Sequence, residues 1–570
     1  MHLLAATPSP STTFSPADWV VLSLYLALLV ATGIWFSRRE QKTTSEYFLA
    51  GRKMPMWAVA VSIIATSLSA ATFVGAPEQS YKGDLTYLST NIGGIIAVII
   101  VAWFFIPAFY RNNCTTVYEL LERRFGTGSK HATSAAFMVG RLFASGARIY
   151  IAAIPLSMIL FGADVEKSAN YELAMILSIA ALTLVGTAYA LLGGISGVIW
   201  TDVIQTVVLV VAVIAAIVVL WMKISPVMPF GQVVEELNHG LRDGGSKLAV
   251  VRLGLDPGKP NFGFDPSAQF TLITAITGFA LLQLAALGTD HDLVQRMLTC
   301  RNAVQGGRSV LLSMALGIPI VTCFMIVGLL LAVHHFLAGD GLMPDSKGVF
   351  VRFIITDMPP GLRALMLAGL FAAGVGSLTS AINAMAATAI KDFYTKLVPD
   401  RGERHYLAAS KLAVVAWGIA LGGFAVLCLY WQKASPQTTL IGLALGVMTF
   451  AYTGLLAVFL TALFTRRGST ASVIAALITG FAVIAFMQDW AWPHWTKLIS
   501  PSLADVKLAF PWHMTIGTII AFAVCCAGRR PPSILSREPS PPEPLNCTQC
   551  GYTMKGLAAS AACPECGAHA

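Results

Sequence analysis

The stretch ATSLSAATFVG, residues 65–75, forms the middle of an apolar segment that runs from Trp57 to Tyr81 and is long enough to cross a membrane. It consists mainly of small and hydroxyl-bearing residues, where a span built only for stability would carry Leu, Ile and Phe. Such residues allow a helix to be interrupted, and carbonyls freed inside a bilayer require a polar partner. The stretch therefore indicates an unwound helix centre that binds a coupling ion and a solute. A close helix-packing face of small residues is the alternative interpretation.

The composition is that of a polytopic membrane protein. Of the 570 residues, 56% are apolar and only 12% are charged, and the mean hydropathy is +0.70. A soluble protein carries about 25% charged residues. The net charge of +9 does not indicate nucleic-acid binding, because the basic residues lie mostly in alternate short loops. The lipid bilayer is the expected partner, and no nucleic acid is expected.

Thirteen apolar segments, each with a core of about 20 residues, predict an all-α transmembrane domain over residues 1–530. The loops after the first, third, seventh, ninth, eleventh and thirteenth spans are basic, so the N-terminus is expected outside and the C-terminus in the cytoplasm, with the protein in the cell membrane. The spans are expected at about residues 17–36, 56–80, 84–110, 133–161, 173–191, 197–222, 268–288, 309–337, 362–391, 406–431, 437–464, 470–488 and 509–528.

A second stretch of small and hydroxyl-bearing residues lies in the ninth span, at residues 372–383. Ser377, Ser380 and Asn383 recur every three residues and therefore lie roughly along one helix face. Sodium is a hard cation that prefers oxygen ligands. Carbonyls of a broken helix and hydroxyls of a facing helix would supply them. The alternative is that these hydroxyls bond back to their own helix.

Three motifs carry a resemblance to a known family. SEYFLAGR at residues 45–52 precedes the second span, GGISGVIWTDVIQ at 193–205 opens the sixth, and DLVQRML at 292–298 follows the seventh. On these motifs the chain resembles the sodium/solute symporters, which include sodium-coupled transporters for sugars, sialic acid, iodide, monocarboxylates and vitamins. The resemblance covers about residues 15–530. It implies a LeuT-like core of five plus five inverted-repeat helices, in which the second and seventh spans are broken.

The resemblance also implies cation sites. Gly376 departs from the family pattern, in which a serine is usual, and this removes one side-chain ligand. A possible second sodium site would use Asp202, Thr379 and Ser380, unless Asp202 only caps its span. The main sodium site, made of backbone carbonyls and a hydroxyl, is expected at Ala65, Leu68, Ala373, Gly376 and Ser377.

The solute positions match two branches of the family in part. Thr72, Asn91 and Gln283 match polar positions of sugar transporters, but the aromatic gate expected at Ala286 and a lysine of the eighth span are missing. In sialic-acid transporters a serine and a threonine, here Ser69 and Thr72, meet the carboxylate. The resemblance therefore leaves a sugar, sialic acid or another organic anion open.

Two arginines in the fourth span require an explanation, because an arginine at a helix centre costs about 2.5–3.5 kcal/mol on the insertion scale. We expect Arg141 near the cytoplasmic end, with its side chain reaching the interface. Arg148 would pair either with an anionic solute through its two-pronged donor geometry, or with a protein carboxylate or carbonyls. The polar residues at 290–292 are expected in a wet loop just past the seventh span.

The C-terminal residues have a different composition. Residues 531–545 form a Pro- and Glu-bearing cytoplasmic linker, and residues 546–570 resemble a small zinc ribbon. Two CxxC pairs suit a structural, tetrahedral four-thiolate zinc site, and iron in a rubredoxin-like site is the alternative. A cytoplasmic partner for this ribbon is possible. The expected ligands are Cys547, Cys550, Cys563 and Cys566.

The sequence thus predicts a sodium-coupled symporter that imports a small polar organic solute by alternating access. It is not expected to be an enzyme. The alternative is a transporter-like membrane sensor or regulator that signals through the C-terminal metal ribbon.

Overall fold

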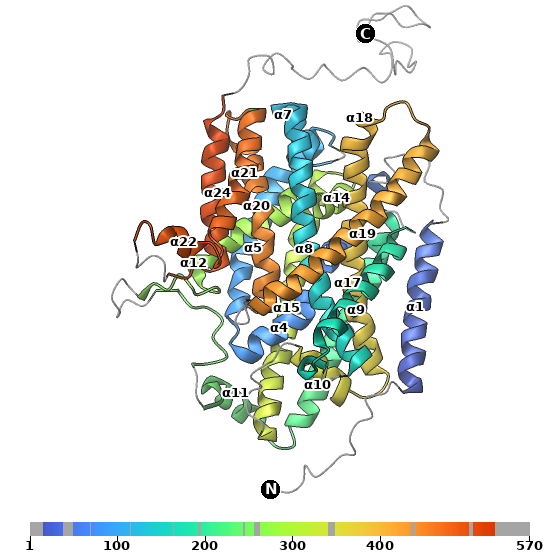
Figure 1. Ribbon diagram of the computed structural model, residues 1–570. Helices are drawn as coiled ribbons and strands as arrows, with labels where there is room; N and C mark the ends of the chain where they lie inside the picture. The colour runs from blue at the N-terminus through green and yellow to red at the C-terminus, as the bar shows by residue number, and fades with distance from the viewer. Residues whose placement is uncertain are drawn as a thin grey trace, which may run out of the picture.

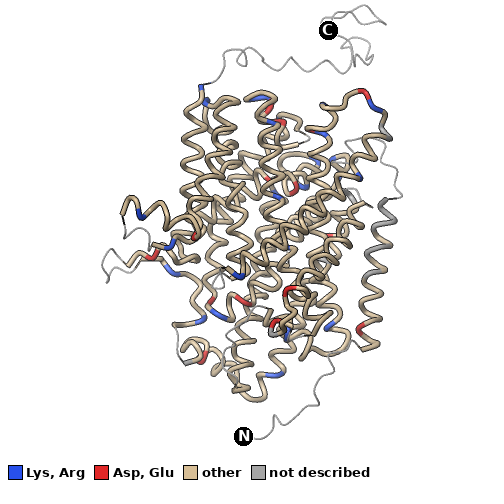
Figure 2. Tube along the Cα trace, viewed as in Figure 1, with Lys and Arg blue, Asp and Glu red and all other residues tan. Residues whose placement is uncertain are grey.

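The structure is a computed structural model that describes residues 15–37, 49–68, 70–114, 116–162, 165–191, 195–242, 245–255, 263–339, 348–434, 439–500 and 506–529. All regular elements in this part of the chain are helices. They form a bundle of long, roughly aligned rods, with the end of α24 at the top of Figure 1 and the start of α1 near the bottom. Charged residues lie at both ends of this bundle and also between them (Figure 2).

The described residues contain ten helices that are long and apolar enough to cross a membrane, or eleven if one bent pair is a single span. The remaining two of the thirteen expected spans are helices as well, namely α1 (Pro16–Ser37) and the shorter α21 (Thr470–Phe486). The long helices of the bundle are α8 (Thr127–Phe161), α9 (Tyr171–Ala190), α10 (Ile195–Ile224), α15 (Ala303–Ala338), α17 (Leu362–Thr388), α19 (Glu403–Ala434), α20 (Leu440–Phe464) and α24 (Phe510–Ala527).

Shorter helices complete the third span and the connections. They are α5 (Thr90–Ile100), the π-helical η3 (Val101–Phe105), α6 (Ile106–Arg111), α7 (Tyr118–Phe125), α11 (Phe230–Asn238), α16 (Val349–Asp357) and α22 (Trp492–Thr496).

The second span is broken where the stretch of small residues predicts it. Helix α3 (Met56–Ser67) ends before Leu68, which has extended backbone angles (φ −79°, ψ 108°), and α4 (Ala70–Lys82) follows. The two helix axes differ by 64°. The last carbonyls of a helix have no partners within it, so the end of α3 presents backbone oxygens to its surroundings.

The seventh span differs from the expectation of a break within about residues 268–288. Helix α12 (Leu272–Thr274), the π-helical η7 (Ala275–Phe279) and α13 (Ala280–Thr289) run on as one span. The helix is interrupted further along, at Asp290, whose backbone is extended (φ −78°, ψ 116°). Its carboxylate accepts a hydrogen bond from the Asp292 amide and so caps α14 (His291–Leu298).

The second half of the broken second span, α4, packs closely against α15. Gly328 allows this approach, because a Cβ at that position would lie 2.2 Å from the Pro77 carbonyl oxygen of α4 and 2.1 Å from the Ser80 hydroxyl. The Ser80 hydroxyl also donates to the carbonyl of Met325, at 2.7 Å. The position of α4 is therefore set by backbone contact with α15.

Candidate functional site

Ser377 provides the clearest sign of a ligand at the second-span break. Its helix α17 packs against both α3 and α4. The side chain is 6% exposed, and its hydroxyl oxygen is buried without a hydrogen-bond partner among the described residues. A buried hydroxyl without a partner costs about 1–3 kcal/mol, so this oxygen fits a group that binds there.

The neighbouring hydroxyl in α17 behaves differently. The Thr379 hydroxyl donates to the carbonyl of Val375, at 2.8 Å, which is the back-bonding expected as the alternative. A hydrogen bond to its own helix therefore satisfies the Thr379 hydroxyl, whereas the Ser377 hydroxyl has no such bond in the described part of the chain.

The residues whose backbone carbonyls are candidate ligands lie at the break and in α17. Ala65 is half-buried near the end of α3, and Leu68 is buried at the interruption. Ala373 and Gly376 lie in α17, on the turn before Ser377. Helix-end carbonyls and a hydroxyl are the kind of hard oxygen donors that an alkali cation prefers.

Arg148 contacts the end of α3. Its Nη1 donates to the carbonyl of Thr66, at 3.3 Å, and the side chain is half-buried in α8. The contact agrees with the expectation that a protein carbonyl serves as partner. It also places a guanidinium beside the break, where a solute would bind.

Arg141 was expected at the interface, and this expectation is wrong. The side chain is 2% exposed and forms ion pairs with Asp290, at 2.9 Å, and with Asp292. The expectation of a wet loop is wrong as well, because Asp290, His291 and Asp292 are all buried. The Asp290 carboxylate also accepts from the Tyr452 hydroxyl, at 2.6 Å. These charges are tolerated at the Asp290 interruption because they are paired with one another, not because they are exposed to water.

Arg296 continues this buried charge cluster. It forms an ion pair with Asp292 at 2.5 Å, donates to the Ser380 hydroxyl at 3.0 Å, and lies 3.4 Å from Asp202. Asp202 lies well inside α10 and accepts from the Ser62 hydroxyl, at 2.5 Å. It therefore does not act as a cap. The guanidinium of Arg296 joins two of the three residues expected for a second sodium.

The solute-matching residues lie on several helices. Thr72 is half-buried in α4, and Gln283 is exposed in α13. Asn91 in α5 donates to the Leu88 carbonyl, at 2.9 Å, and α5 packs against α13. Ser69 lies outside the described residues.

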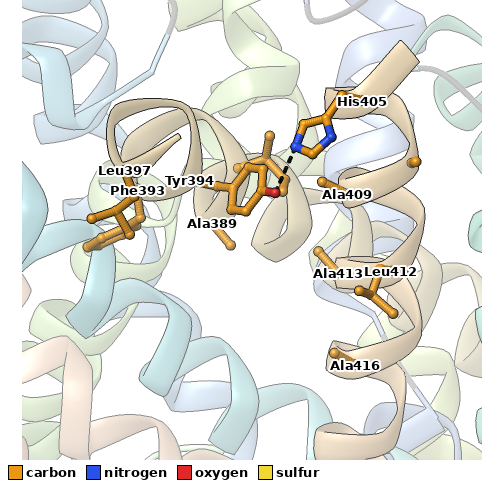
Figure 3. Close-up of a pocket in the computed structure, with 11 residues that line it drawn as sticks. Ala389, Phe393, Tyr394, Leu397, His405, Ala409, Leu412, Ala413 and Ala416 are labelled. Atoms are coloured by element: carbon orange, nitrogen blue, oxygen red, sulfur yellow. Dashed lines mark hydrogen bonds between the residues drawn. The ribbon is translucent and has the colours of Figure 1, made fainter. Parts of the chain in front are cut away.

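A surface groove near the end of α17 is a separate feature. Its volume is about 590 Å³, and it lies between η8 (Ala389–Tyr394), α18 (Thr395–Leu397) and α19. Figure 3 shows its mostly apolar side chains and the 2.8 Å hydrogen bond between Tyr394 and His405. It shares no residue with the set around the break, so it is not the candidate transport site. The lining residues are Ala389, Ile390, Phe393, Tyr394, Leu397, His405, Ala408, Ala409, Leu412, Ala413 and Ala416.

The expected linker and zinc ribbon lie outside the described residues. Within the described ranges, no group of three or more His, Cys, Asp or Glu side chains is arranged to hold a metal ion.

Sequence reasoning assigned no role to four polar residues of this region. Ser62 and Tyr452 are single polar residues in apolar spans, and Gln205 and Arg296 belong to the motifs quoted above. An ionisable side chain within an apolar segment is itself a signal of function. That signal does not apply to Arg296, which follows the seventh span in a stretch that the sequence pattern predicts as a loop.

An apolar helical bundle is typical of secondary transporters when an interrupted span faces a buried hydroxyl, and here that hydroxyl has no partner among the described residues. The chain belongs to the sodium:solute symporter family, whose model matches residues 47–480. It is therefore a multi-pass membrane protein and a sodium-coupled solute symporter, not an enzyme.

Relatives in this family carry different solutes. The sodium/sialic acid symporter NanT of Aliivibrio fischeri is 29% identical over 487 residues, covering 84% of this chain and 88% of the relative. The sodium/sialic acid symporter SiaT of Proteus mirabilis is 27% identical, covering 83% and 89%. The human sodium/iodide cotransporter is 25% identical, covering 93% and 78%.

Solved structures share the LeuT-like fold. A sodium-coupled sialic acid symporter in a substrate-bound, outward-open state matches with a TM-score of 0.71 and 24% identity, covering 90% of this chain and 98% of that one. The nucleobase-cation-symport-1 family transporter Mhp1, in a closed conformation, matches with a TM-score of 0.50 and 16% identity, covering 84% and 93%. At these identities the comparison concerns the fold.

Proposed function

We propose that this symporter imports a small polar organic solute by alternating access and holds its coupling sodium at Ala65, Leu68, Ala373, Gly376 and Ser377. The observation that carries the proposal is the buried Ser377 hydroxyl, which has no partner in the described part of the chain and lies on the helix that faces the break. Moving one positive charge inward through 100 mV provides about 2.3 kcal/mol. A carrier that closes only with ion and solute bound converts this energy into uphill uptake.

Replacing Ser377 with alanine should raise the sodium concentration for half-maximal uptake by about tenfold, which corresponds to about 1.4 kcal/mol. The reason is the loss of one oxygen ligand at the proposed site. The measurement is solute uptake into vesicles over a range of sodium concentrations. Ser178→Ala is the matched control, because Ser178 is also buried in a span but bonds to its own helix at 2.8 Å. Equal sodium activation in the Ser377→Ala variant and the wild type would contradict the site.

The favoured solute is an organic anion, such as sialic acid. Arg148 places a guanidinium beside the break, and guanidinium groups bind carboxylates through paired hydrogen bonds. Two of the relatives described above are sialic acid symporters. A sugar is the second candidate, through Asn91 and Gln283. A thermal-shift screen of sugars, sialic acid, monocarboxylates and amino acids, with and without sodium, distinguishes them.

A second sodium at Asp202, Thr379 and Ser380 is the less favoured alternative. Arg296 already places a positive charge next to Asp202 and Ser380.

The positive-inside pattern supports an orientation with the N-terminus outside and the C-terminus in the cytoplasm.

For the C-terminal tail we propose a structural zinc ribbon, with a regulatory or partner-binding role. A sensor that signals through this ribbon is the alternative to a purely transporting protein. Metal analysis of the purified full chain should find about one zinc ion per chain, lost when Cys547 and Cys550 are replaced by serine, because a four-thiolate site needs all its ligands. Iron in place of zinc would favour the rubredoxin-like alternative. Absence of metal would refute the ribbon.

A further inference from the structure

Gly376 removes a side-chain oxygen from the sodium site, and the structure shows which side chain takes that space. A Cβ built on Gly376 would lie 2.8 Å from Oε1 of Gln205 and 3.6 Å from both Cδ and Nε2. The amide oxygen is therefore the end of Gln205 that approaches residue 376. A side chain at residue 376 would therefore require the end of Gln205 to move aside.

Gln205 lies on α10, which packs against α17, and its side chain is 8% exposed. It lies three residues after Asp202, on the same helix face. Asp202 is already engaged with Ser62 and Arg296. Gln205 has no recorded side-chain hydrogen bond among the described residues, so its amide oxygen is available to a ligand.

We infer that the Gln205 amide oxygen is a ligand of the coupling cation and replaces the hydroxyl that a serine at 376 would supply. The inference rests on the proposed sodium site at Ser377. Gln205 approaches residue 376, which directly precedes Ser377 in α17, and the side chains of Gln205 and Ser377 are both more than nine-tenths buried. An amide carbonyl is a hard, neutral oxygen donor of the kind that alkali and alkaline-earth cations accept. Gly376 and Gln205 thus form an interdependent pair.

The pair can be tested by exchanging its members. Gln205→Ala should raise the sodium concentration for half-maximal uptake by about tenfold, a cost of about 1.4 kcal/mol. Adding Gly376→Ser to that variant should restore most of the sodium affinity, because the space is then free and a hydroxyl enters it. Adding Gly376→Ala instead is the matched control, since it fills the same space without an oxygen.

Two readouts separate the outcomes. Sodium-dependent uptake is one, and the sodium-induced shift of thermal unfolding in detergent, without solute, is the other. Gln205→Leu keeps the volume of the side chain without the oxygen. It should retain wild-type thermal stability in the absence of sodium while losing most of the sodium-induced shift.

If the wild type itself shows no sodium response, the proposed function fails. If the wild type responds and Gln205→Ala and Gln205→Leu respond equally, the inference is overturned while the function stands. Rescue by Gly376→Ala as strong as rescue by Gly376→Ser would assign Gln205 to packing and would also overturn the inference.

Discussion

Replacing Arg141 with methionine is expected to leave little folded protein. Arg141 pairs with two buried carboxylates at the seventh-span interruption, Asp290 at 2.9 Å and Asp292. Removing one partner of a buried ion pair costs about 3–5 kcal/mol, because the remaining charge stays buried without compensation. Whole proteins are stable by only about 5–15 kcal/mol. The measurement is the yield of monodisperse protein in detergent, together with its thermal unfolding.

The same pair predicts a partial rescue. Arg141→Met combined with Asp290→Asn removes both charges, and the asparagine can still accept from the Tyr452 hydroxyl, which donates to Asp290 at 2.6 Å. The double variant should therefore be more stable than Arg141→Met alone, with a coupling of about 0.5–3 kcal/mol. Arg308→Met is the control, because Arg308 is exposed on α15. Simple addition of the two destabilisations would contradict the pairing.

Replacing Gly328 with alanine should displace α4, the second half of the broken second span. The new methyl group would lie 2.2 Å from the Pro77 carbonyl oxygen, which is backbone and cannot move without moving α4. Overpacking of this kind costs about 1–3 kcal/mol. Because α4 begins directly after the break that contributes Leu68 to the proposed sodium site, sodium affinity should fall together with thermal stability. Both are measured on the same purified protein.

Gly317 provides a control on the same helix. A Cβ at Gly317 meets nothing within 4 Å, and alanine favours a helix over glycine by about 1 kcal/mol. Gly317→Ala should therefore leave sodium affinity unchanged and stability equal or higher. A loss in Gly317→Ala as large as that in Gly328→Ala would show that the effect of Gly328→Ala does not come from contact with α4.

The first interruption could be predicted from the sequence because its cause is local. Small and hydroxyl-bearing residues around Leu68 weaken one helix at one place, and the extended backbone occurs there. The second interruption was misplaced because its cause is not local. Asp290 and Asp292 end an apolar segment, which is the pattern of a wet loop. Their partner Arg141 lies about 150 residues earlier in the chain, so no sequence window contains the pair.

The candidate cation site likewise combines features that a sequence can predict with features that it cannot. The family resemblance predicts cation ligands at Ala65 and Ser377 and indicates the departure at Gly376, and these positions stay predictions. The resemblance does not indicate what fills the space at Gly376, because Gln205 approaches it from another helix. Charge pairing and space filling between distant helices are properties of the packed bundle, and a single sequence without its contacts does not specify them.

Helix α15 contains 36 residues, so at 1.5 Å per residue its length is about 54 Å, whereas the hydrocarbon layer is about 30 Å thick. The surplus must project into the headgroups or be absorbed by tilt. Since α15 touches α4 at Gly328, a change in its inclination carries the neighbouring half-helix with it. A bilayer whose thickness altered the tilt of α15 would therefore also move α4.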